Sequence, residues 1–481
     1  MRKTIGNFVS PSLLFIILVV FTVVLGLLTW TVGINFSIAI LATTVLIPLI
    51  AAIIFYPEFG VIIFLVGAYF VMLISRIGVN FPVGTLMDGL ELLLLVGVLI
   101  AQKKEPRWVD FKSPITVGIL VWISYNILQV ANPNAESRLA WIYTIRSTAL
   151  FMLTYFIFVT QIRSVEYIRT ILKIWIALSF LAAIYAIKQE YVGFFDFEMR
   201  SIDTPELRTL LFIGGHWRKF SIFAEPVSFS YNMVISSILC IVLIMGKLKF
   251  YKKILLSICV SILLLAMIFS GTRGAYPLLP AALFLLAILK FNRRILVFFT
   301  FAVLLFIGLV FMPTSNQNIV RFQSAFRPSD DPSFNLRKAN QKRIQPYIQT
   351  HPFGGGLGST GTWGERFSPN SYLAQFPPDS GFVRVAVELG YVGLFIFCTF
   401  LFIILKTGIE NYYSIKDPEL KNYCLAMVLI TFALAIGNYP QEALVQFPIS
   451  IFFYLIISLI RITSILDQNS TVGNQNNLKN D

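Results

Sequence analysis

Long runs of apolar residues alternate with short polar stretches along almost the whole chain. A helix needs about 20 mostly apolar residues to cross the hydrocarbon core of a bilayer. Runs of about this length lie at 12–30, 34–56, 59–77, 83–101, 113–131, 142–160, 167–187, 226–245, 254–269, 273–289, 295–312, 383–405, 421–438 and 443–461. The pattern predicts an all-α polytopic membrane protein with about 14 transmembrane helices, which form a single domain over residues 1–467.

The composition agrees with this fold class. Of the 481 residues, 57% are hydrophobic and only 13% are charged, whereas about a quarter of the residues in a soluble protein are charged. The formal net charge is +14. In a soluble domain this charge would suggest nucleic acid, but in a membrane protein the side on which the basic residues lie matters more. We therefore predict the lipid bilayer as a partner and no nucleic acid.

Lysine and arginine gather in alternate connections between the predicted spans, at 103–112, 247–253, 290–294 and 406–421. Cytoplasmic connections are enriched in these residues. The alternation predicts that both termini are cytoplasmic and that the protein is a multi-pass protein of the plasma membrane. The polar, Asn-rich residues 468–481 are predicted to form a disordered cytoplasmic tail.

Two connections on the predicted outer side are long and basic, at residues 188–225 and 313–380. Within the second, Ser333 is a suitable N-cap for a helix with an irregular apolar face. We expect a short interfacial helix near 333–350, broken at Pro346.

Charged residues lie at the ends of several predicted spans, where burial of charge is costly, at roughly 2.5–3.5 kcal/mol at a span centre. They are Arg76, Asp88, Glu91, Arg146, Arg273, Arg384 and Glu388. All lie toward the outer leaflet in the predicted topology, which indicates an outward-facing site for an anionic substrate. Arginine holds two phosphate oxygens at once. Because nucleotide sugars are cytosolic, a lipid-linked diphosphate is the substrate that fits. Structural ion pairs are the alternative role for each residue taken singly.

Three segments carry more specific features. They are 216–230 (His-Trp-Arg-Lys-Phe-Ser-Ile-Phe-Ala-Glu-Pro-Val-Ser-Phe-Ser), 269–275 (Phe-Ser-Gly-Thr-Arg-Gly-Ala), and the glycine-rich 351–358 (His-Pro-Phe-Gly-Gly-Gly-Leu-Gly) followed by 378–382 and 388–394. Their order and spacing resemble the O-antigen ligase and polysaccharide polymerase superfamily of integral-membrane glycosyltransferases. The resemblance extends from about residue 200 to the end of the twelfth predicted span.

The resemblance implies transfer of a glycan from an undecaprenyl-diphosphate type donor to an acceptor hydroxyl. The reaction would take place at the outer face of the bacterial plasma (inner) membrane, without a cofactor or a required metal. The implied partners are lipid-linked glycans as donor and acceptor, with a chain-length regulator and a flippase as further partners.

The resemblance also implies roles for individual residues. Arg218 and Arg273 look like the arginines with which the family holds the diphosphate, and Arg337 resembles a recurrent arginine ahead of the glycine-rich segment. Ligases typically place His-Asn where this chain has Asp379 and Ser380. This difference favours the polymerase-like branch.

The chemistry requires few groups. Diphosphate is acidic enough to leave without a general acid if fixed arginines stabilise its charge, so a single base near the acceptor suffices for an inverting transfer. Asp379 and Glu225 are the candidate bases, and burial or a neighbouring acid would have to raise the pKa of the base. The alternative role for Asp379 is the N-cap of the twelfth span. Residues expected to support the site are Arg76, Arg146, Arg384, Glu388 and His351.

Three functions compete. A polymerase joins lipid-linked repeat units into a cell-surface or exopolysaccharide, and two basic outer loops suit its two anionic substrates. A ligase moves a finished glycan to a lipid or protein acceptor. A transporter of lipid-linked oligosaccharide would show internal repeats and charges in both halves of the membrane, which the sequence does not convincingly show. The polymerase is therefore preferred to both, and to a non-catalytic scaffold.

Overall fold

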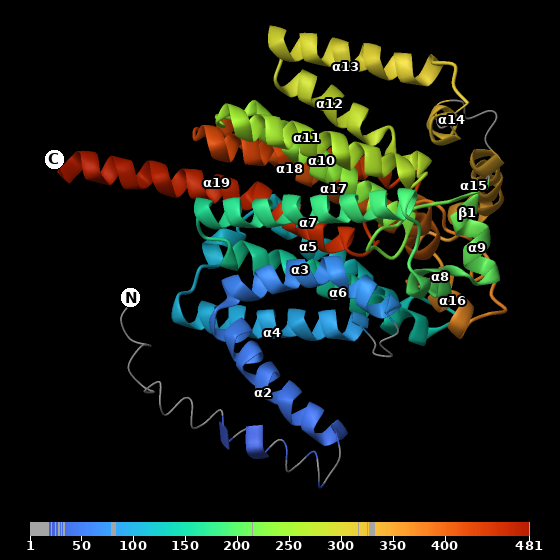
Figure 1. Cartoon of the computed structure of the whole chain (residues 1–481), viewed down its shortest axis with the longest axis horizontal. Coiled ribbons are helices and arrows are strands. Elements are labelled where there is room, and N and C mark those ends of the chain that lie inside the picture. Colours follow the sequence, from blue (N-terminus) through green and yellow to red (C-terminus); the bar gives the residue numbers. More distant parts are fainter. Residues whose placement is uncertain are drawn as a thin grey trace.

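The protein is a bundle of long, roughly parallel and antiparallel helices in a computed structural model (Figure 1). The structure describes residues 34–77, 83–213, 215–315, 317–324, 326 and 332–480, and scattered positions between 19 and 33. The first predicted span, 12–30, lies largely outside the described residues.

Every apolar run predicted from residue 34 onward overlaps a helix. The helices of the bundle are α2 (Ile34–Phe55), α3 (Pro57–Arg76), α4 (Val83–Lys104), α5 (Pro114–Leu128), α6 (Arg138–Gln161), α7 (Val165–Tyr191), α10 (Pro226–Met245), α11 (Phe250–Phe269), α12 (Leu278–Leu289), α13 (Arg293–Phe311), α17 (Gly381–Ser414), α18 (Pro418–Gly437) and α19 (Ile449–Asn480). Among the described residues, ten helices are long and apolar enough to cross a membrane. The prediction of an all-α polytopic membrane protein is confirmed.

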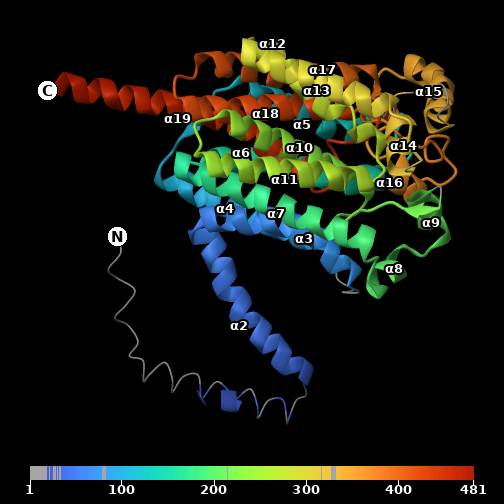
Figure 2. The same ribbon diagram turned by 45° about the horizontal axis from the view of Figure 1, so that its top comes forward.

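The short elements gather at one end of the bundle, opposite the C-terminus (Figures 1 and 2). They are α8 (Asp196–Ile202), α9 (Pro205–Leu211), β1 (Phe212–Ile213), β2 (His216–Trp217), α14 (Gln317–Ser324), α15 (Pro332–Thr350) and α16 (Gly361–Phe367). The two strands pair antiparallel, with Phe212 opposite Trp217. All of these elements come from the two long connections, so both connections lie over the same end of the helices.

The centre of the bundle is formed by α10, α18 and α19, which are the most completely buried spans. A helix that is apolar all round can be buried on every side. Its few polar groups must then pair internally. The Ser179 hydroxyl lies 2.7 Å from Tyr69 Oη and 2.8 Å from Ser236 Oγ. These two hydrogen bonds join α3, α7 and α10 within the core.

Two local expectations differ from the structure. The helix over the second long connection, α15, continues through Pro346 without a break. Proline removes one hydrogen bond, to the carbonyl of Lys342, and Lys342 lies on an exposed stretch of the helix. At the C-terminus, α19 continues to Asn480 through the segment for which a disordered tail is predicted. A helix propagates more readily than it nucleates, and here it grows from a fully packed span.

Candidate active site

The long helix α17 is interrupted near its N-terminal end, at Gly390 (φ +71°, ψ −179°). The interruption frees the carbonyl groups of the preceding turn from their helical partners. The N–H of Gly355 donates to the Val387 carbonyl (2.9 Å), and the N–H of Gly356 donates to the Glu388 carbonyl (2.8 Å). The glycine-rich segment is thus docked on the broken helix by its own backbone.

The side chain of Glu388 holds the same segment from a buried position, with 2% of the residue exposed. Its carboxylate accepts from the Gly358 N–H (3.0 Å), the Thr360 hydroxyl (2.5 Å) and Arg384 Nε (3.1 Å). Because both carboxylate oxygens are occupied by these donors, Glu388 serves to position the segment and is not available as a base.

Arg384 connects this arrangement to a second acid. Its Nη1 lies 2.7 Å from the carboxylate of Glu442, in the connection between α18 and α19. Burial raises the pKa of Glu442, Arg384 opposes that rise, and the nearby carboxylates of Glu388 and Asp379 add to it. Glu442 is absent from the residues predicted from the sequence, because it lies alone between two spans with no recognisable motif around it.

The structure also settles the alternative role of Asp379. The N-cap of α17 is Ser380, whose hydroxyl accepts from the Val383 N–H (3.5 Å), so the alternative role of Asp379 as the cap is wrong. The next residue, Gly381, donates its N–H to the Asn438 carbonyl (2.9 Å). This contact places Asp379 beside the connection that carries Glu442.

Glu225 lies directly before α10 and makes no side-chain capping bond. Burial raises the pKa of Glu225, while Arg218 lowers it and Glu442 raises it further. Arg218 itself is anchored to the turn after α11, because its Nε donates to the Ser270 carbonyl (3.0 Å) and its Nη2 to Thr272 Oγ1 (3.0 Å). Arg218, Glu225 and Glu442 therefore share one neighbourhood.

The same turn carries Arg273. A Cβ added at the next residue, Gly274, would lie 3.1 Å from the Tyr231 hydroxyl and 3.2 Å from the Pro440 ring, so the turn is pressed against both. Pro440 is two residues before Glu442. Arg337 of α15 is close enough to Tyr231 to interact with it electrostatically. Of the three arginines expected to bind diphosphate, Arg218 thus interacts with Glu225, whereas Arg273 lies in the turn packed against Tyr231 and Arg337 interacts with Tyr231.

Comparison with known families identifies one domain. Residues 258–398 match the model of the O-antigen ligase family. The matched stretch makes up 141 of the 481 residues. This match confirms the resemblance to the O-antigen ligase and polysaccharide polymerase superfamily, and it supports a membrane glycosyltransferase of this type. The comparison with curated proteins gives no match.

The matched stretch contains only some of the arginines and carboxylates described above. It includes Arg273, Arg337 and Asp379, together with the Arg384–Glu388 pair. The remaining members are Arg218, Glu225 and Glu442, which lie outside the matched residues. The charged cluster formed by these residues therefore includes segments on both sides of the matched stretch.

Arg76 supports this cluster indirectly. Its Nη2 donates to the Ala224 carbonyl (2.6 Å), and its guanidinium lies 3.9 Å from the centroid of the Phe220 ring. Both contacts hold the chain immediately before Glu225. Arg76 therefore holds the backbone that leads into Glu225.

Two other predicted residues have different neighbours. Arg146 of α6 pairs with Asp88 of α4 (3.4 Å). His351 stacks on the ring of Tyr347 at 3.9 Å, and its Nδ1 lies 3.0 Å from the Tyr347 carbonyl oxygen. Within the described residues, neither has a hydrogen bond or ion pair with the arginines and carboxylates of the cluster. A structural role explains both.

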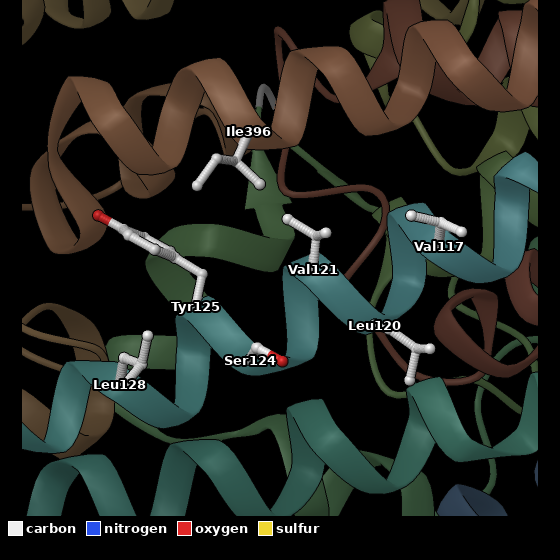
Figure 3. Close-up of a pocket in the computed structure, with 7 residues that line it drawn as sticks. All are labelled: Val117, Leu120, Val121, Ser124, Tyr125, Leu128 and Ile396. Atoms are coloured by element: carbon white, nitrogen blue, oxygen red, sulfur yellow. The ribbon is translucent and has the colours of Figure 1, made fainter.

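An apolar groove of about 380 Å³ adjoins the broken helix, between α5 and α17. Figure 3 shows Val121 and Tyr125 of α5 facing Ile396 of α17. The Tyr125 hydroxyl donates to the Leu389 carbonyl (2.7 Å), directly beside Gly390. Tyr125 thus satisfies a further carbonyl freed by the break and ties α5 to the site.

Proposed function

We propose that the protein is a polysaccharide polymerase, which transfers a growing glycan from one polyprenyl diphosphate to a second lipid-linked repeat unit at the outer face of the bacterial plasma membrane. The observation that carries this proposal is that Glu225, Glu442 and Asp379 interact electrostatically, that Arg218 interacts with Glu225, and that the segments of Arg273 and Arg337 both lie near Tyr231. Arginines beside carboxylates are suited to an anionic leaving group and a hydroxyl nucleophile.

In the proposed reaction, the arginines hold the diphosphate of the donor. As the bond from the anomeric carbon to the diphosphate oxygen breaks, their guanidinium groups stabilise the charge that develops on the leaving group. A carboxylate removes the proton of the acceptor hydroxyl, whose oxygen attacks the opposite face of the sugar and inverts the anomeric centre. The products are a longer glycan on the acceptor lipid, free polyprenyl diphosphate and one proton.

Of the candidate bases, Glu225 best meets the chemical requirement, because its pKa is raised by burial and it makes no capping bond. A carboxylate with a raised pKa is a stronger base once it has lost its proton. Asp379 is the second candidate. The carboxylate of Glu442 pairs with Arg384 at 2.7 Å. This ion pair suits Glu442 to a positioning role.

The transfer rate is expected to fall as the pH drops through a pKa above 4.5, the ordinary value for glutamate. The base acts only when it is deprotonated, so activity is present above this pKa and lost below it. Glu225→Gln should lower kcat by about 10²- to 10⁴-fold and remove this pH dependence. Rates of the purified protein between pH 4 and pH 9 check both. If Asp379→Asn removes the pH dependence and Glu225→Gln keeps it, the base is Asp379.

The fold should tolerate Glu225→Gln. A raised pKa means that the folded state disfavours the ionised carboxylate, so that ionisation costs stability above the pKa. The melting temperature of Glu225→Gln at pH 8 is therefore expected to equal or exceed that of the wild type. A large decrease would mean that the lost activity reflects misfolding.

The product pattern tests the function itself. Purified protein in lipid nanodiscs receives a polyprenyl-diphosphate-linked repeat unit, without a nucleotide or a second acceptor. A ladder of lengthening glycans with released polyprenyl diphosphate is the expected result. Reaction only after a different acceptor is added would favour a ligase, the second candidate, which the description of the matched family supports. No reaction with any acceptor would favour a transporter.

The outward orientation has its own test. Arg200 lies in the first long connection and Lys247 follows α10 in a basic connection, and both are exposed. In a background that lacks the exposed Cys398, a membrane-impermeant maleimide should label Arg200→Cys in intact spheroplasts and Lys247→Cys only after lysis. The reverse pattern would place the charged cluster on the cytoplasmic side.

A further inference from the structure

The segment between β2 and α10, residues 218–225, makes a strained turn at Ser221. Among the described residues, Ser221 is the only one other than glycine that has a positive φ (+54°). A residue with a side chain rarely adopts this left-handed conformation, which persists only where the surrounding structure imposes it. The turn lies between Arg218 and Glu225, so the contacts that impose it bear on the placement of site residues.

The side chain of Gln189, in the last turn of α7, holds Ser221 by both of its backbone groups. Gln189 Oε1 accepts from the Ser221 N–H (2.9 Å), and Gln189 Nε2 donates to the Ser221 carbonyl oxygen (3.2 Å). Both residues are fully buried. Buried backbone groups are paired in folded proteins, and here one amide side chain pairs with the donor and the acceptor of the same residue.

The carboxylate of Glu198 in α8 fixes the orientation of the Gln189 amide. It accepts from Gln189 Nε2 (2.5 Å) and from the Phe195 N–H (2.8 Å), and it lies 3.6 Å from Lys188 Nζ. A carboxylate that pairs with an ammonium group offers only acceptors, so the NH₂ group of the amide must face it. The amide oxygen then faces the Ser221 N–H. Because Glu198 is also fully buried, this pair acts on the turn from inside the protein.

Glu225 depends on this turn more than Arg218 does. The guanidinium of Arg218 has its own anchors in the turn after α11, on the Ser270 carbonyl and on Thr272. Glu225 makes no side-chain capping bond to α10. The position of the Glu225 carboxylate relative to Arg218 therefore follows the course of the chain from Ser221 onward.

We propose that Gln189 is a positioning residue of the transfer reaction, which fixes the turn at Ser221 and thereby orients the Glu225 carboxylate. The inference rests on the proposed function, with Glu225 as the base. Gln189 acts together with Arg76, whose Nη1 also donates to the Ser221 carbonyl oxygen (3.5 Å). Since Gln189 is fully buried, it acts through the segment and not on the substrate. A shift of about 1 Å in a reacting group can lower a rate by about 100-fold.

The first test is Gln189→Leu, which keeps the approximate size of the side chain and removes both hydrogen bonds to Ser221. We expect kcat to fall by about 100-fold with an unchanged KM for the donor, because Arg218 keeps its own anchors. If Gln189 acts through Glu225, the double variant Gln189→Leu/Glu225→Gln should be no slower than Glu225→Gln alone. Effects that multiply in the double variant would overturn the inference, as would a normal kcat for Gln189→Leu.

An exchange of the two buried side chains distinguishes positioning from loss of the fold. Gln189→Glu places two carboxylates against each other and should lower kcat at least as much as Gln189→Leu. Adding Glu198→Gln restores a donor opposite an acceptor and keeps an acceptor for the Ser221 N–H, so this pair should recover most of the rate. An exchanged pair as slow as Gln189→Glu would contradict the inference. Gln161→Leu, at a buried glutamine at the end of α6, is the matched control and should keep its activity.

A measurement that does not depend on activity separates this inference from the proposed function. In a background that lacks the exposed Cys398, a nitroxide label is attached to Ala224→Cys, at an exposed position next to Glu225. The label should move faster in Gln189→Leu than in the otherwise unchanged protein. If the wild type makes no polymer but the label moves faster in Gln189→Leu, the proposed function fails and the hold of Gln189 on the segment stands. If polymer forms and neither the label motion nor kcat changes, the positioning role fails and the proposed function stands.

Discussion

Arg273→Ala is expected to lower glycan transfer by about 10²- to 10³-fold while the protein still folds and inserts. Arg273 lies in the turn that packs against Tyr231 and Pro440. Pro440 is two residues before Glu442 in the sequence. Loss of one fixed donor to a developing negative charge typically costs this factor in kcat. Release of polyprenyl diphosphate by the purified protein measures it.

Whether Arg273→Ala changes kcat or KM identifies the role of Arg273. An effect in kcat at saturating substrate indicates stabilisation of the leaving group, whereas an effect in KM alone indicates ground-state binding. Arg273→Lys should recover only part of the rate, because lysine keeps the charge but not the planar fork. Arg107→Ala, at an exposed arginine just after α4, is the control and should retain full activity. Near-normal transfer by Arg273→Ala would remove this residue from the site.

Gly390→Ala is expected to abolish transfer and to destabilise the protein by about 3 kcal/mol or more. At φ +71° and ψ −179°, Gly390 occupies a region of backbone conformation that is essentially restricted to glycine. An added Cβ would also collide with the Pro352 carbonyl oxygen, which accepts from the Val392 N–H on the far side of the break. The glycine-rich segment would then lose its place on α17. Thermal unfolding in detergent and the transfer assay measure the two effects.

The matched control is Gly89→Ala in α4, where an added Cβ meets nothing within 4 Å. This variant should keep both the melting temperature and the activity, because alanine favours a helix over glycine. A Gly390→Ala protein with wild-type stability and transfer would show that docking of the glycine-rich segment does not depend on the break.

The membership of the charged cluster illustrates how far sequence reasoning reaches. The resemblance to a known superfamily singled out Arg218, Arg273 and Arg337, and their roles in the site stay predictions. Glu442 could not be selected from the sequence, because its significance depends on the 2.7 Å contact with Arg384, a residue of another helix. A long-range ion pair produces no periodicity or local motif in the sequence.

Local signals were ambiguous wherever two neighbouring residues could serve the same purpose. Asp379 and Ser380 are both good N-cap residues, and only the actual start of α17 shows that Ser380 is used. Glu388 could be recognised as a charge near a span end. Its role in holding the glycine-rich segment follows from the hydrogen bonds that Gly358 and Thr360 donate to its carboxylate.

The sequence by itself determined the helices and their order. In a bilayer each segment must satisfy its backbone hydrogen bonds internally, so a run of apolar residues is sufficient to specify a helix. The tertiary structure alone decided which charges meet, where α17 is interrupted and what fills the interruption. Those features depend on contacts between segments far apart in the chain, such as Gly356 with Glu388 and Arg384 with Glu442. Their energies arise only when the packed helices bring the partners within hydrogen-bonding distance.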